Sequence, residues 1–106
     1  MQELTPILYG YTVAESTLAR KIAEGHAFEK HVRNEGQFPG ILTQEQFATA
    51  IQRIMDNPSA SKRLARDRTA YWDDTIGTIV ICDPHTADGG TAFKPRAGRS
   101  YYENLR

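Results

Sequence analysis

The sequence has little cysteine, no long hydrophobic run and no excess of charge. Cys82 is the only cysteine among the 106 residues, which excludes an intramolecular disulfide framework and a multi-cysteine metal site. Because Cys82 follows Val80 and Ile81, we expect a buried, inert thiol in a strand. No stretch approaches the length of a membrane span, and the N-terminus lacks the pattern of a signal peptide. The sequence therefore predicts a soluble domain with no membrane anchor.

The charges balance overall but are unevenly placed. Lysine and arginine number 13, as do aspartate and glutamate, so the formal net charge is zero, which argues against indiscriminate nucleic-acid binding. Basic residues dominate two segments, 58–72 and 91–106. They are Lys62, Arg63, Arg66 and Arg68 in the first, and Lys94, Arg96, Arg99 and Arg106 in the second. The segments form a cationic groove if they meet in space, or two solvated basic surfaces if they do not.

The length fits a single domain, and its first half has helical patterns. Either Thr12 or Ser16 can cap a helix that includes Leu18 and Ile22, and Gly25 is placed to end or kink it. Thr43 and Gln46 have the spacing of a capping box. They precede apolar residues at helical spacing, namely Phe47, Ile51, Ile54 and Met55. Asn57-Pro58 should end this second helix.

The second half has the composition of strands joined by turns. We expect a short basic turn of helix within residues 59–66 and strands over 69–72, 78–82 and 91–94. Residues 100–102 are predicted to form a fourth, edge strand. Helices followed by a meander of this kind indicate an α+β fold. In that fold the N-terminal helices pack on one face of a C-terminal antiparallel β-sheet.

A short early segment, Gly25-His26-Ala27-Phe28-Glu29-Lys30-His31-Val32, is rich in residues that transfer protons or carry positive charge. If the first helix continues to Val32, about 100° per residue places the apolar residues on one arc. His26 and Lys30 then lie one turn apart at the edge of that arc, where they can share a site. Glu29 falls within the arc, and His31 projects from the other side as a solvated residue.

The spacing of these residues excludes several familiar sites. His26 and His31 are five positions apart, which misses the i,i+4 spacing of a helical metal site. Gly89-Gly90 precedes a strand and not a helix, so it is no phosphate-binding P-loop. No serine lies in a nucleophile-elbow context. We therefore expect no metal and no other cofactor.

The histidine, lysine, arginine and hydroxyl side chains that remain as candidates suit metal-independent cleavage of RNA, in which the 2′-hydroxyl attacks the neighbouring phosphate. This reaction needs a base, an acid, and cations or hydroxyls around the charged intermediate. His26 is the leading acid or base, with His31 and Glu29 as open alternatives, while His85 is expected to be exposed and incidental. The other predicted catalytic residues are Lys30, Arg68, Thr91 and Tyr101. The predicted substrate-binding residues are Lys94, Arg96, Arg99 and Lys62.

The order of these motifs resembles C-terminal toxin domains of contact-dependent growth inhibition systems and other polymorphic bacterial toxins. The similarity rests on the early segment, Arg68-Thr-Ala-Tyr-Trp-Asp, Thr78-Ile-Val-Ile-Cys-Asp, Asp88-Gly-Gly-Thr-Ala-Phe-Lys-Pro and Tyr101. The fold group is the one shared by barnase, EndoU, colicin E5/D and RelE nucleases. The resemblance covers residues 25–106 as a ribonuclease toxin domain and leaves residues 1–24 as a helical lead-in.

That resemblance implies an endoribonuclease, often directed at tRNA, that leaves a 2′,3′-cyclic phosphate. It also implies export as part of a larger toxin, action in the cytoplasm of a neighbouring bacterium, and a cognate immunity protein. Two other functions stay open at this point. One is an NAD-consuming toxin that grips the dinucleotide with its glycine-rich loop and aromatic residues. The other is a non-catalytic interaction module.

Overall fold

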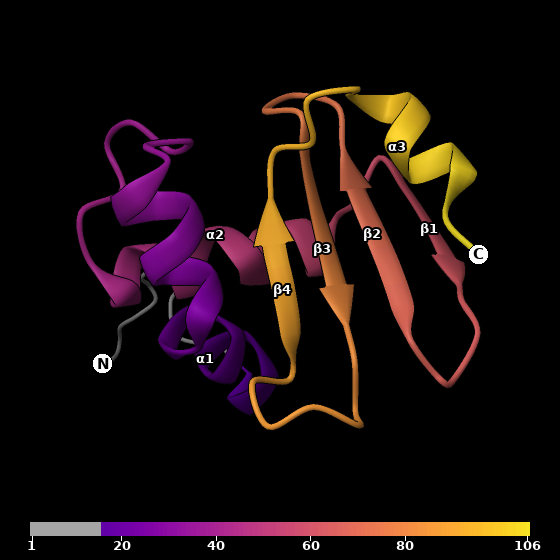
Figure 1. Ribbon diagram of the computed structural model, residues 1–106, viewed down its shortest axis with the longest axis horizontal. Helices are drawn as coiled ribbons and strands as arrows, with labels where there is room; N and C mark the ends of the chain where they lie inside the picture. The colour runs from indigo at the N-terminus through magenta and orange to yellow at the C-terminus, as the bar shows by residue number, and fades with distance from the viewer. Residues whose placement is uncertain (1–15) are drawn as a thin grey trace, which may run out of the picture.

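The computed structural model describes residues 16–106, which form a helical half and a sheet half side by side (Figure 1). The helical half contains α1 (Thr17–Glu24), η1 (Phe28–Asn34) and α2 (Gln44–Asp56). The sheet half contains β1 (Ala60–Arg63), β2 (Thr69–Asp73), β3 (Thr78–Cys82) and β4 (Gly90–Phe93), followed by α3 (Arg99–Asn104). The strands form a four-stranded antiparallel meander in the order β1-β2-β3-β4. This arrangement confirms the predicted α+β fold.

Helix α1 begins and ends at residues that the sequence marks. The Ser16 hydroxyl accepts a hydrogen bond from the backbone N–H of Ala19 at 3.1 Å, which satisfies a free donor of the first turn. Thr12, the other predicted cap, lies outside the described residues. Gly25 is the C-cap, and Ile22 is fully buried against α2. The helix therefore stops at Gly25 and does not run unbroken to Val32.

The segment after Gly25 winds as a π-helix, η1, in which the N–H of Glu35 donates to the carbonyl of Lys30. Wider winding changes the direction of every side chain relative to an α-helix. Phe28 and Val32 are buried as expected, but two other expectations were wrong. Glu29 is exposed and pairs with Arg33 on the outer surface. His31 is only 8% exposed, so it is a buried residue and not a solvated one.

Helix α2 confirms the predicted capping box. The Thr43 hydroxyl accepts from the N–H of Gln46, and the Gln46 side chain accepts from the N–H of Thr43. Its apolar residues Phe47, Ile51 and Ile54 are buried, and the C-cap is Asn57. In Figure 1 this helix passes behind the sheet. It therefore covers one sheet face and supplies the middle of the core.

The basic segment after α2 is a strand and not the predicted turn of helix. Residues Ala60 to Arg63 pair with β2 in the register Ala60↔Trp72 to Arg63↔Thr69. Residues 60–63 include only one apolar residue, so a helix here would have no face to bury. As a strand, the same residues alternate between half-buried and exposed positions. Pairing with β2 satisfies the backbone, and it prevails over local propensity.

The C-terminal segment is a helix, α3, and not the predicted edge strand. Gly98 adopts φ 65° immediately before it, and Arg99 forms an i,i+4 ion pair with Glu103 at 3.1 Å. Tyr102 is buried and stacks with Trp72, with ring centroids 6.3 Å apart. Helical spacing is what turns Tyr102 toward the sheet while Tyr101 stays 39% exposed.

The two sheet faces pack against different partners. Val80, Cys82 and Ala92 join the helices in the larger core, while Ile79 and Ile81 join Tyr102 of α3 in a smaller one. Cys82 is buried in β3, as expected, and its burial raises the pKa of the thiol to about 11. Among residues 16–106, no helix is long and apolar enough to cross a membrane.

Strand β4 should be especially sensitive to substitution at Gly90. Gly90 has φ 136°, and an added Cβ would overlap the carbonyl oxygen of Ile81 on β3. We expect Gly90→Ala to lower the free energy of unfolding by more than about 3 kcal/mol. Gly77→Ala is the matched control, since Gly77 also has positive φ but nothing within 4 Å, and should cost about 1 kcal/mol. Urea unfolding of both variants measures the difference, and equal losses would contradict the close approach of β3 and β4.

Candidate acid–base site along strand β4

Residues 25–32 and residues 88–95, far apart in the sequence, meet at a histidine–carboxylate pair. His26 Nδ1 lies 2.5 Å from Asp88 Oδ2, and the backbone N–H of His26 donates to the same oxygen at 3.3 Å. His26 is 58% exposed and Asp88 37% exposed, so solvent or a substrate can reach both. These hydrogen bonds hold the pKa of the Asp88 carboxyl below its usual range. A carboxylate at Nδ1 fixes the ring and leaves Nε2 for proton transfer.

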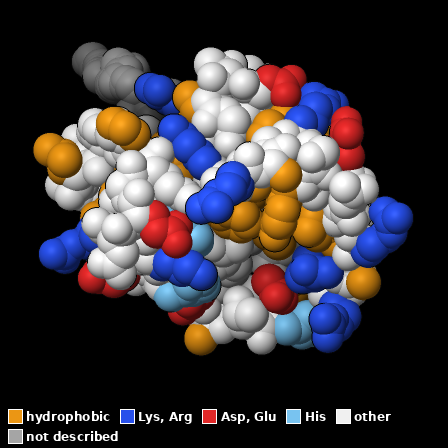
Figure 2. Space-filling view, turned by 45° about the horizontal axis from the view of Figure 1, so that its top comes forward, with side chains coloured by type: hydrophobic (Ala, Val, Ile, Leu, Met, Phe, Trp, Pro, Cys, Tyr) orange, Lys and Arg blue, Asp and Glu red, His pale blue; other side chains and the backbone are white. Residues whose placement is uncertain are grey.

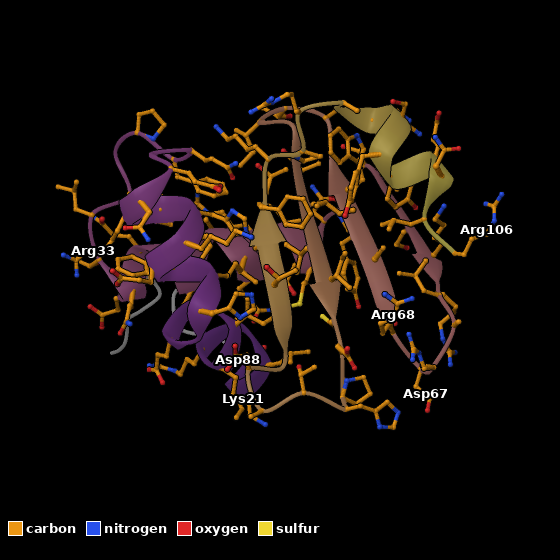
Figure 3. The ribbon with its side chains drawn as sticks, viewed as in Figure 1. Lys21, Arg33, Asp67, Arg68, Asp88 and Arg106 are labelled. Atoms are coloured by element: carbon orange, nitrogen blue, oxygen red, sulfur yellow. The ribbon has the colours of Figure 1, made fainter. Side chains whose placement is uncertain are left out.

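Gly25 is what lets Asp88 approach the helical half. A Cβ at this position would lie 2.8 Å from Asp88 Cγ, which is closer than side chains normally approach. The backbone of Gly25 is extended, with φ −87° and ψ −163°, so the requirement is for space and not for a left-handed conformation. The neighbouring turn of α1 also contacts this loop, because Lys21 Cβ would be 3.4 Å from a Cβ at Gly89. Figure 3 shows Lys21 and Asp88 together at the lower ends of α1 and β4.

Strand β4 begins two residues after Asp88 and presents two side chains on the sheet face that points away from α2, which we call the open sheet face. Thr91 lies directly opposite Ile81, and Phe93 lies opposite Ile79, so both side chains are on the face away from α2. Thr91 is half-buried on β4, three residues after Asp88. Figure 2 shows hydrophobic side chains gathered on this side of the molecule with Lys and Arg side chains around them. Thr91 therefore lies between the His26–Asp88 pair and an aromatic group at the far end of the strand.

That aromatic group contains a second histidine–carboxylate pair. His31 Nδ1 lies 2.7 Å from Glu35 Oε1, and the imidazole stacks on Phe93 with centroids 5.1 Å apart. Tyr101 packs edge-on against the same ring at 5.4 Å. Within residues 16–106, Nε2 of His31 makes no hydrogen bond. The structure thus places Thr91 on β4, His26 against Asp88 in the loop before it, and Tyr101 against Phe93 at its end. It adds His31, which the sequence left as an open alternative.

The two basic segments do meet in space, but several of their cations are occupied. Lys62 Nζ donates to the carbonyl of Glu103 at 3.2 Å and lies over the Tyr102 ring. Arg68 donates to the carbonyls of Ala65 and Arg106, each at 3.0 Å. These contacts attach the end of the chain to β1 and β2.

Arg99 is bound by carboxylates on both sides. Its guanidinium pairs with Glu103 and with Asp74, each at 3.1 Å, and these hydrogen bonds raise its pKa. Lys94 and Arg96, which are also predicted to bind substrate, and Lys30, which is predicted to be catalytic, have no carboxylate partner within residues 16–106. Lys94 Nζ is 5.2 Å from the Phe38 ring centroid, and its backbone N–H donates to Gln37. Lys30 and Arg96 are exposed and form no ion pair within the described part of the chain.

Three residues of this site were missed by sequence reasoning, namely Asp88, Glu35 and Lys21. Glu35 had a readable signal, since it follows His31 at the i,i+4 spacing that lets helical side chains meet. Asp88 is 62 positions from His26, so only the packing of the loop against α1 reveals the pair. His85 is exposed, as predicted, and its Nε2 lies 3.3 Å from Asp67.

Comparison with known proteins does not assign the chain to a family. No protein-family model matches the chain, and no curated protein is significantly similar to it. Within residues 16–106, no group of three or more histidine, cysteine, aspartate or glutamate side chains is placed to hold a metal ion.

The His26–Asp88 contact can be tested through the pKa of Asp88. In the His26→Ala variant the Asp88 carboxyl loses both its side-chain partner and that partner's charge, so its pKa should rise toward 3.8. Because a lowered carboxyl pKa stabilises the fold at high pH, the stability difference between the two proteins should vanish as the pH falls through that pKa. Carbon-detected NMR titration of Asp88 measures the shift.

A glycine substitution provides a second test of the same contact. Gly25→Ala should displace Asp88 without straining the backbone, and so should also raise the pKa of the Asp88 carboxyl. His85→Ala removes a histidine from the other exposed pair and should leave Asp88 unchanged. A wild-type titration curve for Asp88 in Gly25→Ala would show that the close approach at Gly25 does not control the contact.

Proposed function

We propose that the protein is a metal-independent endoribonuclease that cleaves RNA by attack of the 2′-hydroxyl on its own phosphate. The observation that carries the proposal is the His26–Asp88 pair, in which an exposed imidazole is oriented by a carboxylate. A base of this kind removes the proton from the 2′-hydroxyl as the oxygen bonds to phosphorus. The bond from phosphorus to the 5′-oxygen then breaks, and an acid returns a proton to that oxygen. The products are a 2′,3′-cyclic phosphate and a free 5′-hydroxyl.

The roles of the other residues follow from their places along β4. His31, oriented by Glu35, is the second proton-transfer group, since its Nε2 has no partner within the described residues. Thr91 lies on the strand between the two histidine pairs, where its hydroxyl can donate to a phosphoryl oxygen. Lys21 and Lys30 supply positive charge from α1 and η1. Phe93 and Tyr101 offer ring faces or edges to an unpaired base.

We further propose the biological setting that the sequence resemblance implies. The substrate is tRNA, the domain is delivered into neighbouring bacteria as part of a larger exported toxin, and a cognate immunity protein blocks it. The sheet face that carries Thr91 and Phe93 supports this setting, because Phe93 is half-buried, Tyr101 is 39% exposed, and basic side chains lie on the same side of the molecule (Figure 2). Such a surface suits either an RNA strand or a protein that covers the site. Sequencing total RNA after brief induction in a bacterial host tests the tRNA assignment by looking for one cleaved species.

The catalytic assignment is tested with purified protein and bulk bacterial tRNA, with and without EDTA. Wild type should cleave equally in both buffers and leave 2′,3′-cyclic phosphate ends. His26→Ala should lower the cleavage rate by about 10²-fold to 10⁴-fold, since it removes a general acid or base. Asp88→Asn should lower it by less, because the imidazole remains but loses its orientation.

The control is His85→Ala, which removes a histidine of similar exposure from a pair with Asp67. It should cleave at the wild-type rate. Thermal unfolding of each variant separates lost catalysis from lost folding. Intact tRNA with wild-type protein in both buffers would reject the proposed function, and so would an unchanged rate for a folded His26→Ala.

A further inference from the structure

The turn between β1 and β2 has an unusual backbone for its sequence. Arg66 and Asp67 both have positive φ, 62° and 63°, and the Arg68 N–H reaches back to the Ala65 carbonyl at 3.5 Å. Positive φ at both central residues defines a type I′ turn, which strongly favours Asn-Gly. Holding a non-glycine residue in this region costs about 1–2 kcal/mol. Strain of this kind often marks a functional position, because the surrounding structure must maintain it.

The strained turn holds arginines with no counter-charge. Arg66 at its tip and Arg63 before it are both exposed, and neither forms an ion pair within residues 16–106. The one acidic residue of the turn, Asp67, contacts His85 of the β3–β4 loop at 3.3 Å. Arg68 bonds the Ala65 carbonyl through Nε, which fixes the turn from inside. The turn therefore presents the positive charges of Arg63 and Arg66 in a protein whose net charge is zero.

The turn also lies at the same end of the sheet as the His26–Asp88 pair. In Figure 3, Asp67 and Arg68 are at the lower end of the β1–β2 hairpin, and Asp88 is at the lower end of β4. β3 alone lies between β2 and β4, so at about 4.8 Å per strand spacing these two strands are about 10 Å apart. The turn and the pair lie beyond β2 and β4 on either side, at least that far from each other. An RNA strand that contacts the His26–Asp88 pair can therefore extend along this end of the sheet to the turn.

We propose that the β1–β2 turn is a phosphate-binding site for the RNA strand, at the same end of the sheet as the bond that is cut. Arg66 makes the principal contact and Arg63 a second one, through guanidinium groups whose forked donors match phosphate oxygens. The turn contacts the backbone and not the bases, so it fixes the position of the strand and carries no sequence preference. This inference rests on the proposed ribonuclease function and adds a substrate contact that lies outside its acid–base residues.

Replacing Arg66 with glycine tests the proposal, because it should lower the affinity for RNA without lowering the thermal stability of the fold. Arg66→Gly removes the charge but relieves the left-handed backbone, so its melting temperature should equal or exceed that of wild type. The same variant should bind RNA about tenfold more weakly, since it loses a charge-assisted hydrogen bond. Binding is measured on a His26→Ala background, in which cleavage should be slow, by fluorescence anisotropy with bulk bacterial tRNA. Arg63→Gln should give a smaller loss.

Salt dependence and a matched arginine identify the contact. The plot of log affinity against log salt concentration should become shallower by about 0.7–0.9 when one phosphate contact is lost. Arg33→Gln is the control, because Arg33 is an exposed arginine on the opposite side of the helical half (Figure 3). It should keep the wild-type salt slope. Wild-type affinity and slope in Arg66→Gly, or equal losses in Arg33→Gln, would overturn the inference.

A parallel titration with poly-L-glutamate separates RNA from an acidic protein as the partner. A loss of affinity in Arg66→Gly that is larger for tRNA than for poly-L-glutamate supports phosphate recognition, and an equal or larger loss for poly-L-glutamate rejects it. These measurements need no cleavage, so they can fail while wild type still cuts tRNA. Equally, wild type can fail to cut tRNA while the turn still binds it, and the two outcomes remain distinct.

Discussion

Asp88 connects the two halves of the molecule at the point where α1 ends. Its carboxylate accepts from the backbone of His26 and contacts the His26 ring, and it can do so only because Gly25 has no Cβ. The same break ends regular α-helical winding, and η1 follows as a π-helix. That winding places His31 on Phe93 instead of in solvent. One close approach between a loop and a helix end thus fixes the surroundings of both histidines.

The middle of the fold could be predicted from the sequence because its patterns are strong and local. The capping box at Thr43 and the apolar run of β3 each specify one element without help from distant residues. The edges could not be predicted in this way. Residues 60–63 become a strand through pairing with β2, and Tyr102 is turned inward by stacking on Trp72. In both segments a tertiary contact decides between conformations that local propensity leaves close in free energy.

The sequence predicted several residues of the candidate site, but it did not predict which of them contact one another. The two motifs that carry His26 and Thr91 meet in the loop before β4, where His26 contacts Asp88, a residue with no distinguishing local pattern. His31 was misplaced because an angle of about 100° per residue applies to an α-helix and not to η1. A carboxylate four residues later was the available signal, and it is also the contact that orients the ring.

A neutral net charge is compatible with the proposed binding of RNA because the positive charges of this protein are placed selectively. Lys62, Arg68 and Arg99 hold α3 and the end of the chain against the sheet, where carbonyls and carboxylates accept from them. Such cations are poorly available to a substrate, since binding it would detach α3. Arg63 and Arg66, at the strained turn, are exposed and do not hold any part of the chain in this way. In the proposed complex, the phosphate backbone would therefore contact Arg63 and Arg66 at the β1–β2 turn, while the His26–Asp88 pair contacts the bond that is cut.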